Sequence, residues 1–172
     1  MENKKIVIDA DILRSSGTTE HPISSASRKV LQAVLDSACF AVVNEELENE
    51  WKQHSSRVAI GWRASMRSKS KIIRCAEGNF YYSIVHDSGL EEKLRRIALK
   101  DSHLVTLAIG HDKIVTSNDD RARKAFCNLC GERTELGQIF WVNVTNNSAE
   151  IINALCNKYQ TLNDDHRLSS IE

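Results

Sequence analysis

Carboxylate side chains stand next to the short apolar runs of this chain, and their number suits the binding of a metal ion. The apolar run 6–8 ends at Asp9, and a second aspartate follows two residues later. The acidic positions beside apolar runs are Asp9, Asp11, the glutamates of the stretch 44–50, Asp101, Asp119 and Asp120. Like charges that lie close together repel, and a divalent cation is the usual compensation. Carboxylate oxygens suit Mg²⁺ or Mn²⁺, so the residue types predict a site for one of these ions.

The elements that must position these carboxylates are short buried strands that alternate with helices. Continuous apolar runs, the pattern of parallel strands covered on both faces, predict strands at 5–9, 39–43, 112–119 and 138–144. Helical spacing of apolar residues predicts helices at 24–38, 44–54, after residue 61, 89–98, 101–109, 121–130 and 148–160. This order predicts an α/β fold with a central, mostly parallel sheet of four to five strands and helices on both faces. In such sheets ligands bind outside the carboxyl ends of the strands, where the acidic positions fall.

Length and composition fit a single domain that spans residues 1–172. The chain has 172 residues, of which 41% are hydrophobic and 27% are charged. No apolar run approaches the roughly 18 residues of a membrane helix, and no signal-peptide core precedes the first strand. Five cysteines, an odd number, fit a reducing compartment better than a disulfide framework. We therefore expect a cytoplasmic protein that has no membrane partner.

Charge is unevenly distributed along the chain, although the formal net charge is zero. Residues 51–76 contain no Asp or Glu and directly follow the acidic stretch 44–50. A basic surface beside a carboxylate cluster suits an anionic ligand such as a nucleic-acid backbone, and a pair of solvated helices is the alternative interpretation. The candidate nucleic-acid-binding residues are Lys52, Arg57, Arg63, Arg67, Lys69, Lys71 and Arg74.

In order and spacing, the acidic positions resemble those of the PIN-domain family of metal-dependent nucleases. In that family an aspartate ends the first strand, a glutamate follows the second strand, an aspartate opens a central helix, and a last aspartate follows a strand ending in threonine. The matching segments here are VIDADIL (7–13), VVNEELENEW (42–51), KDSHLVTLAIGHDKIVTSND (100–119) and DDRAR (119–123). The resemblance covers about residues 4–145 and implies a single PIN-like domain with a C-terminal helical extension, 146–172.

The resemblance implies that the catalytic residues, which are also the metal ligands, are Asp9, Glu50, Asp101 and Asp119. Glu50 is the preferred glutamate because the family often places an aromatic residue next, and Trp51 follows it here. Glu46 lies one helical turn earlier on the same face and is the reserve for this role.

The chain departs from the family pattern at two places. Asp11 stands where a small polar residue is usual, and extended backbone would place its side chain on the same side as that of Asp9, so Asp11 is a reserve ligand. The last aspartate usually comes two residues after the threonine, where this chain has Asn118. Asn118, Asp119 and the reserve Asp120 therefore remain alternatives for this corner of the site.

The resemblance implies a metal-dependent endoribonuclease that hydrolyses phosphodiester bonds. Many small members of the family cleave RNA and act as toxins of toxin–antitoxin pairs, so a toxin or defence ribonuclease is expected, with DNA still open as substrate. The implied partners are RNA, an antitoxin or another protein inhibitor, and a second copy of the chain in a homodimer. The implied cofactor is Mg²⁺ or Mn²⁺.

Two other functions are open. The segment DADIL (9–13) resembles the start of haloacid-dehalogenase-like phosphatases, in which Asp9 would be the nucleophile and Asp11 the general acid. In those enzymes the late acidic pair is a separate element, whereas here it follows the threonine at once. A catalytically inactive PIN-like module that binds RNA or protein is the third hypothesis, and Asn118 favours it.

Plain structural roles account for several of these residues taken singly. Asp101 suits the N-cap of a helix that starts at residue 102, and Asp119 or Asp120 suits the N-cap of the next helix. Cys127 and Cys130 form a CxxC motif at helical spacing, which fits two small buried residues better than half of a zinc site.

Overall fold

The computed structural model describes residues 3–76, 78–157 and 160–170. The strands are β1 (Lys5–Ile8), β2 (Phe40–Val43), β3 (Ile72–Arg74), β4 (Ile114–Thr116) and β5 (Phe140–Val142). The α-helices are α1 (Ala10–Ser15), α2 (Pro22–Asp36), α3 (Glu45–His54), α4 (Arg57–Ser68), α5 (Phe80–His86), α6 (Glu92–Ile109), α7 (Asp120–Leu129) and α8 (Val144–Cys156). Short 3₁₀-helices are η1 (Thr134–Gln138), η2 (Asp164–His166) and η3 (Leu168–Ser170).

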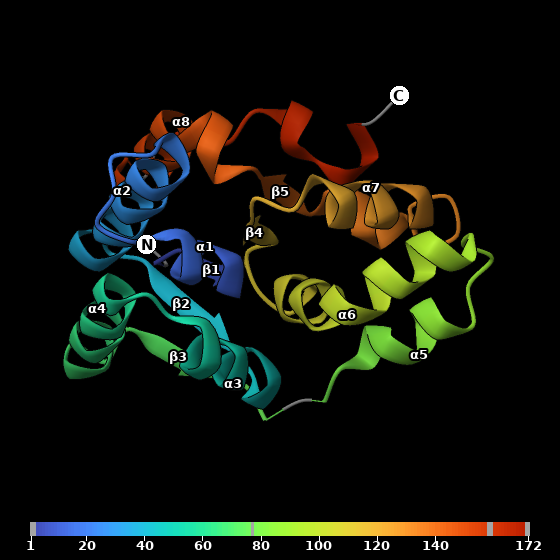
Figure 1. Ribbon diagram of the computed structural model, residues 1–172. Helices are drawn as coiled ribbons and strands as arrows, with labels where there is room; N and C mark the ends of the chain where they lie inside the picture. The colour runs from blue at the N-terminus through green and yellow to red at the C-terminus, as the bar shows by residue number, and fades with distance from the viewer. Residues whose placement is uncertain (1–2, 77, 158–159, 171–172) are drawn as a thin grey trace.

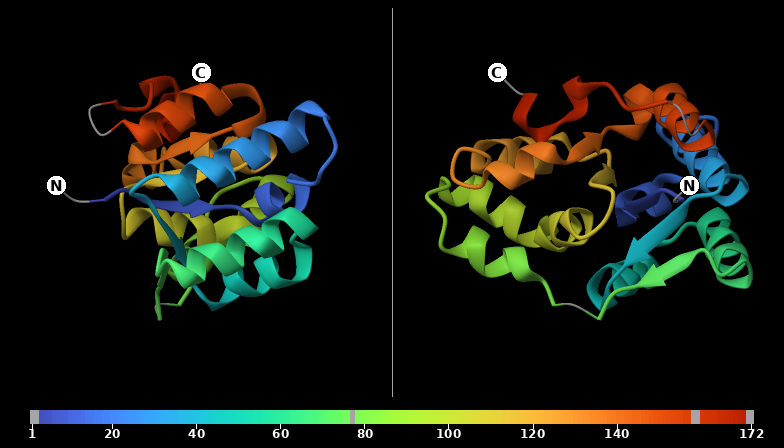
Figure 2. Two further views of the ribbon diagram at one scale, coloured as in Figure 1. Left: turned by 90° about the vertical axis from the view of Figure 1, so that its left-hand side faces the viewer. Right: turned by 180° about the vertical axis from the view of Figure 1, so that it is seen from behind.

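The strands form one parallel sheet in the order β3-β2-β1-β4-β5. Helices α2, α4 and α8 lie on one side of this sheet, and α5, α6 and α7 lie on the other (Figure 1). The views from the left and from behind show the same layers (Figure 2). The predicted α/β fold, with a parallel sheet between two layers of helices, is therefore confirmed. None of the helices that the structure describes combines the length and the apolar character needed to cross a membrane.

The sequence of β1 is continuously apolar because this strand lies in the centre of the sheet. Ile6, Val7 and Ile8 are all completely buried, because helices cover both faces of the sheet. Burying side chains of this size contributes roughly 1.5–3 kcal/mol each. Two tryptophans join the same core: the indole of Trp51 donates to the carbonyl oxygen of Ile8 at 2.9 Å, and its ring meets that of Trp62 edge-on.

Helix α6 is continuous, so the prediction of two helices separated by a polar break at 100–102 is wrong. Asp101, Ser102 and His103 are all buried within the helix, with exposed fractions of 6%, 0% and 0%. Their polar atoms have neighbours on other elements; the hydroxyl of Ser102, for example, accepts a hydrogen bond from Asn79 at 2.8 Å. Asp101 therefore lies in the second half of a long helix, and its predicted role as an N-cap is also wrong.

Helix α1 was not predicted, and it changes the backbone around the first aspartates. Asp9 is the N-cap of α1, and Asp11 lies in its first turn. The expectation that extended backbone aligns these two side chains is therefore wrong. A capping aspartate that directly follows a buried strand ends the strand and begins the helix at one residue.

The edge strand β3 was not identified as a strand because its three residues lie within the basic segment. It pairs with β2, Ala41 lying opposite Ile72. At the other end of the chain, α8 begins at Val144, where the side chain of Asn143 caps it, and it is kinked at Asn147, whose φ of −129° is not helical. The predicted helix start at 148 matches the part of α8 that follows this kink. Helix α8 packs along α2, so the C-terminal helix is part of one helical layer.

Candidate active site

The sheet order creates a crevice between β1 and β4. These strands are neighbours, and the chain continues from β1 toward β2 but from β4 toward β5, on the opposite side. Ligands bind at such a switch point, outside the carboxyl ends of the strands. A pocket of about 560 Å³ lies there, and its acidic lining residues are Asp9, Asp11, Glu50, Asp101, Asp119 and Asp120. The structure thus brings the four predicted catalytic carboxylates together with two of the reserves, while Glu46 does not line this pocket.

Asp9 is held in a fixed orientation at the end of β1. The hydroxyl of Ser117 donates to its Oδ2 at 2.7 Å, and the backbone N–H of Asp11 donates to its Oδ1 at 3.3 Å. Only 8% of Asp9 is exposed. Burial raises the pKa of Asp9, and the hydrogen bond from Ser117 opposes this rise without cancelling it. The charged form of this carboxyl is therefore unfavourable in the protein alone.

The pKa values of Asp11 and Asp101 are raised as well. Burial, followed by the charge of Asp9, raises the pKa of Asp11 to about 8 and that of Asp101 to about 7. Asp11 accepts a hydrogen bond from the backbone N–H of Asn118 at 2.9 Å through Oδ2, whereas its Oδ1 is buried and has no hydrogen-bond partner among the described residues. Ionisation of all three aspartates is therefore unfavourable, and a cation bound among them would offset this penalty.

Glu50 enters the pocket from α3 and is paired with a histidine of α6. His103 is completely buried, with Nε2 3.4 Å from Glu50 Oε2 and Nδ1 3.5 Å from Glu46 Oε1. Burial lowers the pKa of His103, but the two glutamates outweigh it, and the net pKa is raised. Burial raises the pKa of Glu50, but His103 outweighs it, and the net pKa is lowered. The two glutamates thus favour the charged form of His103, and His103 favours the charged form of Glu50 at the pocket wall, with Glu46 near its other ring nitrogen.

Asn118, Asp119 and Asp120, the three alternatives that the sequence left open after β4, differ in their contacts. Asp119 is the N-cap of α7, and its Oδ1 accepts from the N–H groups of Arg121 and Ala122 at 2.9 and 3.1 Å. Its charge also contributes to the raised pKa values of the neighbouring aspartates. The side-chain oxygen of Asn118 instead accepts two hydrogen bonds from Thr145.

Asp120 is exposed and accepts a hydrogen bond from Asn143 at 3.0 Å. Of the three candidates, Asp119 is therefore the one coupled electrostatically to the buried aspartates.

The donor set fits a hydrated Mg²⁺ or Mn²⁺. Within residues 3–76, 78–157 and 160–170, no three His, Cys, Asp or Glu side chains lie close enough to hold one ion together. Mg²⁺ does not require three, because it usually keeps several waters and binds through one or two carboxylates. Asp9 and Asp101 offer such a pair, and the orphaned Oδ1 of Asp11 is a buried acceptor beside them. All of these donors are hard oxygens.

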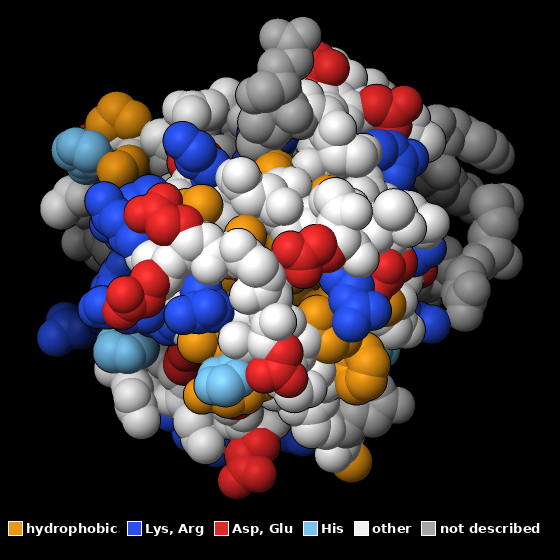
Figure 3. Space-filling model, turned by 90° about the vertical axis from the view of Figure 1, so that its right-hand side faces the viewer, with side chains coloured by type: hydrophobic (Ala, Val, Ile, Leu, Met, Phe, Trp, Pro, Cys, Tyr) orange, Lys and Arg blue, Asp and Glu red, His pale blue; other side chains and the backbone are white. Residues whose placement is uncertain are grey.

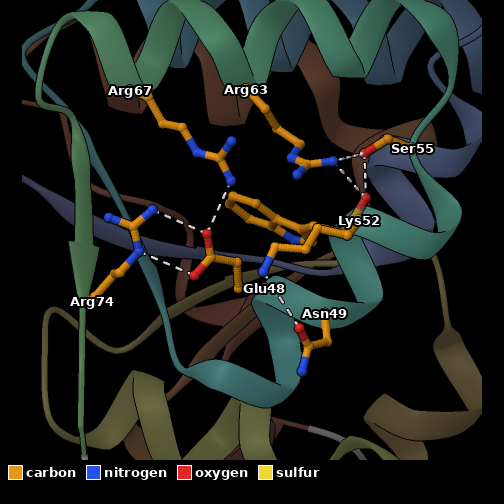
Figure 4. Close-up of polar contacts among 8 residues, drawn as sticks. Glu48, Asn49, Lys52, Ser55, Arg63, Arg67 and Arg74 are labelled. Atoms are coloured by element: carbon orange, nitrogen blue, oxygen red, sulfur yellow. Dashed lines mark hydrogen bonds and ion pairs between the residues drawn. The ribbon is translucent and has the colours of Figure 1, made fainter.

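Part of the basic segment 51–76 serves the fold. The guanidinium of Arg63, which is 8% exposed, donates to the Trp51 carbonyl and the Ser55 hydroxyl at the end of α3 (Figure 4). The ammonium of Lys71, which is 9% exposed, donates to three carbonyls at the end of α2. Two of the seven predicted nucleic-acid-binding residues are therefore buried and bonded to backbone.

Two more cations of this segment are paired with a glutamate. Arg67 and Arg74 both point toward Glu48, from α4 and β3, and each lies 3.0 Å from Glu48 Oε1 (Figure 4). Hydrogen bonds from these arginines, that from Arg74 foremost, lower the pKa of Glu48 to about 2. The predicted residues that are exposed and have no acidic partner in the described chain are Lys52, Arg57 and Lys69.

Several residues at the pocket had no signal in the sequence. Ser117 is buried and bonds both Asp9 and the backbone N–H of Asp119, but a serine after a strand is too common to predict this. Cationic side chains also line the pocket, and they are scattered singly along the chain, so no charged run identifies them. They are Arg14, Lys100 and Arg121, and His54 lines the pocket beside them.

The CxxC motif shows no feature of a metal site. Burial raises the pKa of Cys127 to about 11, and it also raises the pKa of Cys130. Zinc binds cysteines as thiolates. Both side chains are partly buried against the core, and this burial disfavours the thiolate form. The structure thus supports the interpretation of these two cysteines as packing residues.

Comparison of the chain with models of protein families, with curated proteins and with solved structures gives no match.

Proposed function

We propose that the protein is a divalent-metal-dependent endonuclease that hydrolyses phosphodiester bonds, with RNA as the preferred substrate. The observation that supports the proposal is a group of three aspartates with raised pKa values in one open pocket, of which Asp9 and Asp101 are buried and Asp11 is half-buried. Folding destabilises their charged forms, so a structural role alone does not account for them. Such perturbed groups in a cleft are typical of functional sites.

The chain's own residues would divide the work as follows. Asp9 and Asp101 would hold the ion, with Glu50 on the opposite wall and Asp119 at the start of α7. What the ion supplies when bound is neutralisation of these carboxylates and Lewis acidity toward a phosphate oxygen and the attacking water. Ser117 orients Asp9, and His103 orients Glu50. Without a cation the acidic pocket repels phosphate, so substrate binding depends on the metal.

The preference for RNA, a toxin or defence role, a protein inhibitor and a homodimer all follow from the resemblance to PIN-like nucleases and stay predictions. A cytoplasmic location is likewise proposed. Cys39, Cys127, Cys130 and Cys156 are free thiols, as expected in a reducing compartment.

A phosphatase with Asp9 as nucleophile is the second candidate. The observation that favours it is the raised pKa of Asp11, about 8, which keeps this side chain protonated as a general acid must be. Against it, both oxygens of Asp9 already accept hydrogen bonds.

Cleavage assays test the proposal. Structured and single-stranded RNA and DNA are incubated with the protein in Mg²⁺, Mn²⁺ or EDTA, and wild type is compared with Asp9→Asn and Asp101→Asn. The exposed Asp36, at the end of α2, gives a matched control, Asp36→Asn. We expect cleavage of RNA that requires the metal, survives in the control, and falls about 100-fold or more in both pocket variants.

Other outcomes reject the proposal. Cleavage that persists in EDTA or in both pocket variants would show that the carboxylate pocket is not the active site. No cleavage by folded, metal-supplied protein would favour a binding module. Hydrolysis of p-nitrophenyl phosphate without polynucleotide cleavage would favour the phosphatase.

A further inference from the structure

The mouth of the acidic pocket carries a ring of cations. Arg14 belongs to α1, Lys100 to α6 and Arg121 to α7, and all three are exposed residues that line the pocket. His54, the last residue of α3, also lines it. Three helices that meet at the carboxyl ends of the strands thus each contribute one cation to the mouth. We call Arg14, Lys100 and Arg121 the rim cations.

The rim cations do not neutralise the carboxylates beneath them. Among the residues that the structure describes, the side chains of Arg14 and Lys100 make no hydrogen bond or ion pair, and Arg121 lies 3.6 Å from Asp119 at the surface. Arg14 lowers the pKa of Asp11, and Lys100 lowers that of Asp101, but burial outweighs both effects. The rim cations are therefore close to the acidic floor and still available to an outside anion.

Four of the seven cations of the basic segment 51–76 differ in this respect. Arg63 and Lys71 are buried, and Arg67 and Arg74 share Glu48. Figure 3 shows Lys and Arg side chains gathered toward its left-hand edge. This edge is the side of the molecule that faces the viewer in Figure 1, where the carboxyl ends of the strands lie. Available positive charge thus borders the pocket itself.

We propose that Arg14, Lys100 and Arg121 bind the phosphates that flank the reacting one, so that the substrate is an extended polynucleotide strand and not a mononucleotide. The inference rests on the proposed function. The acidic floor, once it holds a cation, accommodates one phosphate. Three cations on three different helices line the mouth around this position, and a polynucleotide supplies one further charge per nucleotide on either side. Contacts of this kind position a strand without reading its sequence.

The test is equilibrium binding of a fluorescein-labelled oligouridine of about twelve nucleotides, followed by fluorescence anisotropy in Mg²⁺ at several salt concentrations. The oligomer carries phosphorothioate linkages, which keep the backbone charges and slow cleavage, so the metal-binding aspartates stay intact. The rim triple variant carries Arg14→Gln, Lys100→Gln and Arg121→Gln. A matched triple variant removes three exposed cations that do not line the pocket, Lys29, Lys93 and Arg133. A competing triple variant changes Lys52, Arg57 and Lys69 to Gln.

We expect the rim triple variant to bind about 30-fold more weakly, and the slope of log K against log salt to fall by about 2, since each lost contact to a single strand removes about 0.7. The matched triple variant should change affinity by less than about 3-fold. Restoring charge with Arg14→Lys, Lys100→Arg and Arg121→Lys should restore most of the binding, which separates lost contacts from lost folding.

Three results overturn the inference: unchanged binding by the rim triple variant, a larger loss in the competing triple variant, or competition by uridine monophosphate as strong as that by unlabelled oligomer. The outcome is separable from that of the proposed function. Oligomer binding through the rim without any cleavage by wild type would reject the nuclease and keep the rim. Cleavage by the rim triple variant with an unchanged KM, in an otherwise wild-type chain, would reject the rim and keep the nuclease.

Discussion

Replacing Asp101 by Asn should stabilise the metal-free protein, and only at pH values where the wild-type carboxyl is ionised. Asp101 is 6% exposed, and its pKa is raised from 3.8 to about 7 by burial first and then by the charge of Asp9. Between about pH 4 and pH 7 the folded state therefore binds a proton that the unfolded chain has lost, so the free energy of unfolding falls as pH rises through this interval. Asn has nearly the same shape and avoids this penalty.

The magnitude follows from the shift in pKa. A difference of about three pKa units corresponds to at most about 4 kcal/mol, and relaxation of the pocket reduces this to about 2–4 kcal/mol. At about pH 5 the wild-type side chain is neutral, and Asp101→Asn should have little effect beyond its altered hydrogen bonding. At about pH 8.5 the variant should melt roughly 5–15 °C above wild type in EDTA.

Thermal melting in EDTA at both pH values measures this difference. The variant Asp36→Asn is the control, because it removes an exposed carboxylate outside the pocket. An Asp101→Asn variant that gains no more stability at the higher pH than at the lower would refute the account of the pocket as a strained, charge-repelling site. Excess Mg²⁺ should reduce the difference, since it binds only the folded wild type.

Two further predictions concern the cations that the fold uses. Lys71→Met should lower the free energy of unfolding by about 1–3 kcal/mol in urea titrations, because three carbonyls at the end of α2 lose their donor. The control is Lys69→Met, which changes an exposed lysine. A Lys71→Met variant as stable as wild type would contradict this prediction. Glu48→Gln should cost about 1–2 kcal/mol at neutral pH, since Arg67 and Arg74 lose their shared acceptor. The folded pKa of Glu48 is lowered to about 2, so this stabilisation should disappear as pH falls from about 4.5 toward 2; a cost that persists at the acid end would point to packing alone.

The sequence sufficed for the fold class because the core strands are unambiguous. The run 6–8 is apolar on both faces, and in the structure all three of its residues are fully buried. The capping role of Asn44 was also predictable, because asparagine is a preferred N-cap residue and Asn44 directly precedes the helix. In the structure its side chain accepts a hydrogen bond from the N–H of Leu47 at the start of α3. Local chemistry decides both of these features.

Features that depend on distant contacts were not predictable. The polar residues 100–102 predicted a helix break, because the sequence does not show that Asp101 and Ser102 are buried, with Ser102 bonded to Asn79. Similarly, the basic segment predicted a binding surface because the sequence does not show that Arg63 and Lys71 are bonded to the ends of α3 and α2. The rim cations come from separate helices, so no pattern along the chain groups them.

The most direct test of the central claim, that the carboxylate pocket holds a divalent ion, is calorimetric titration of Mn²⁺ into the metal-free protein near neutral pH in buffers of different ionisation enthalpy. Because the pKa values of Asp11 and Asp101 are raised to about 8 and 7, binding should be saturable and should release on the order of one proton. Asp9→Asn should abolish it, and Asp36→Asn should leave it unchanged. No saturable binding, or binding that survives in Asp9→Asn, would contradict the account.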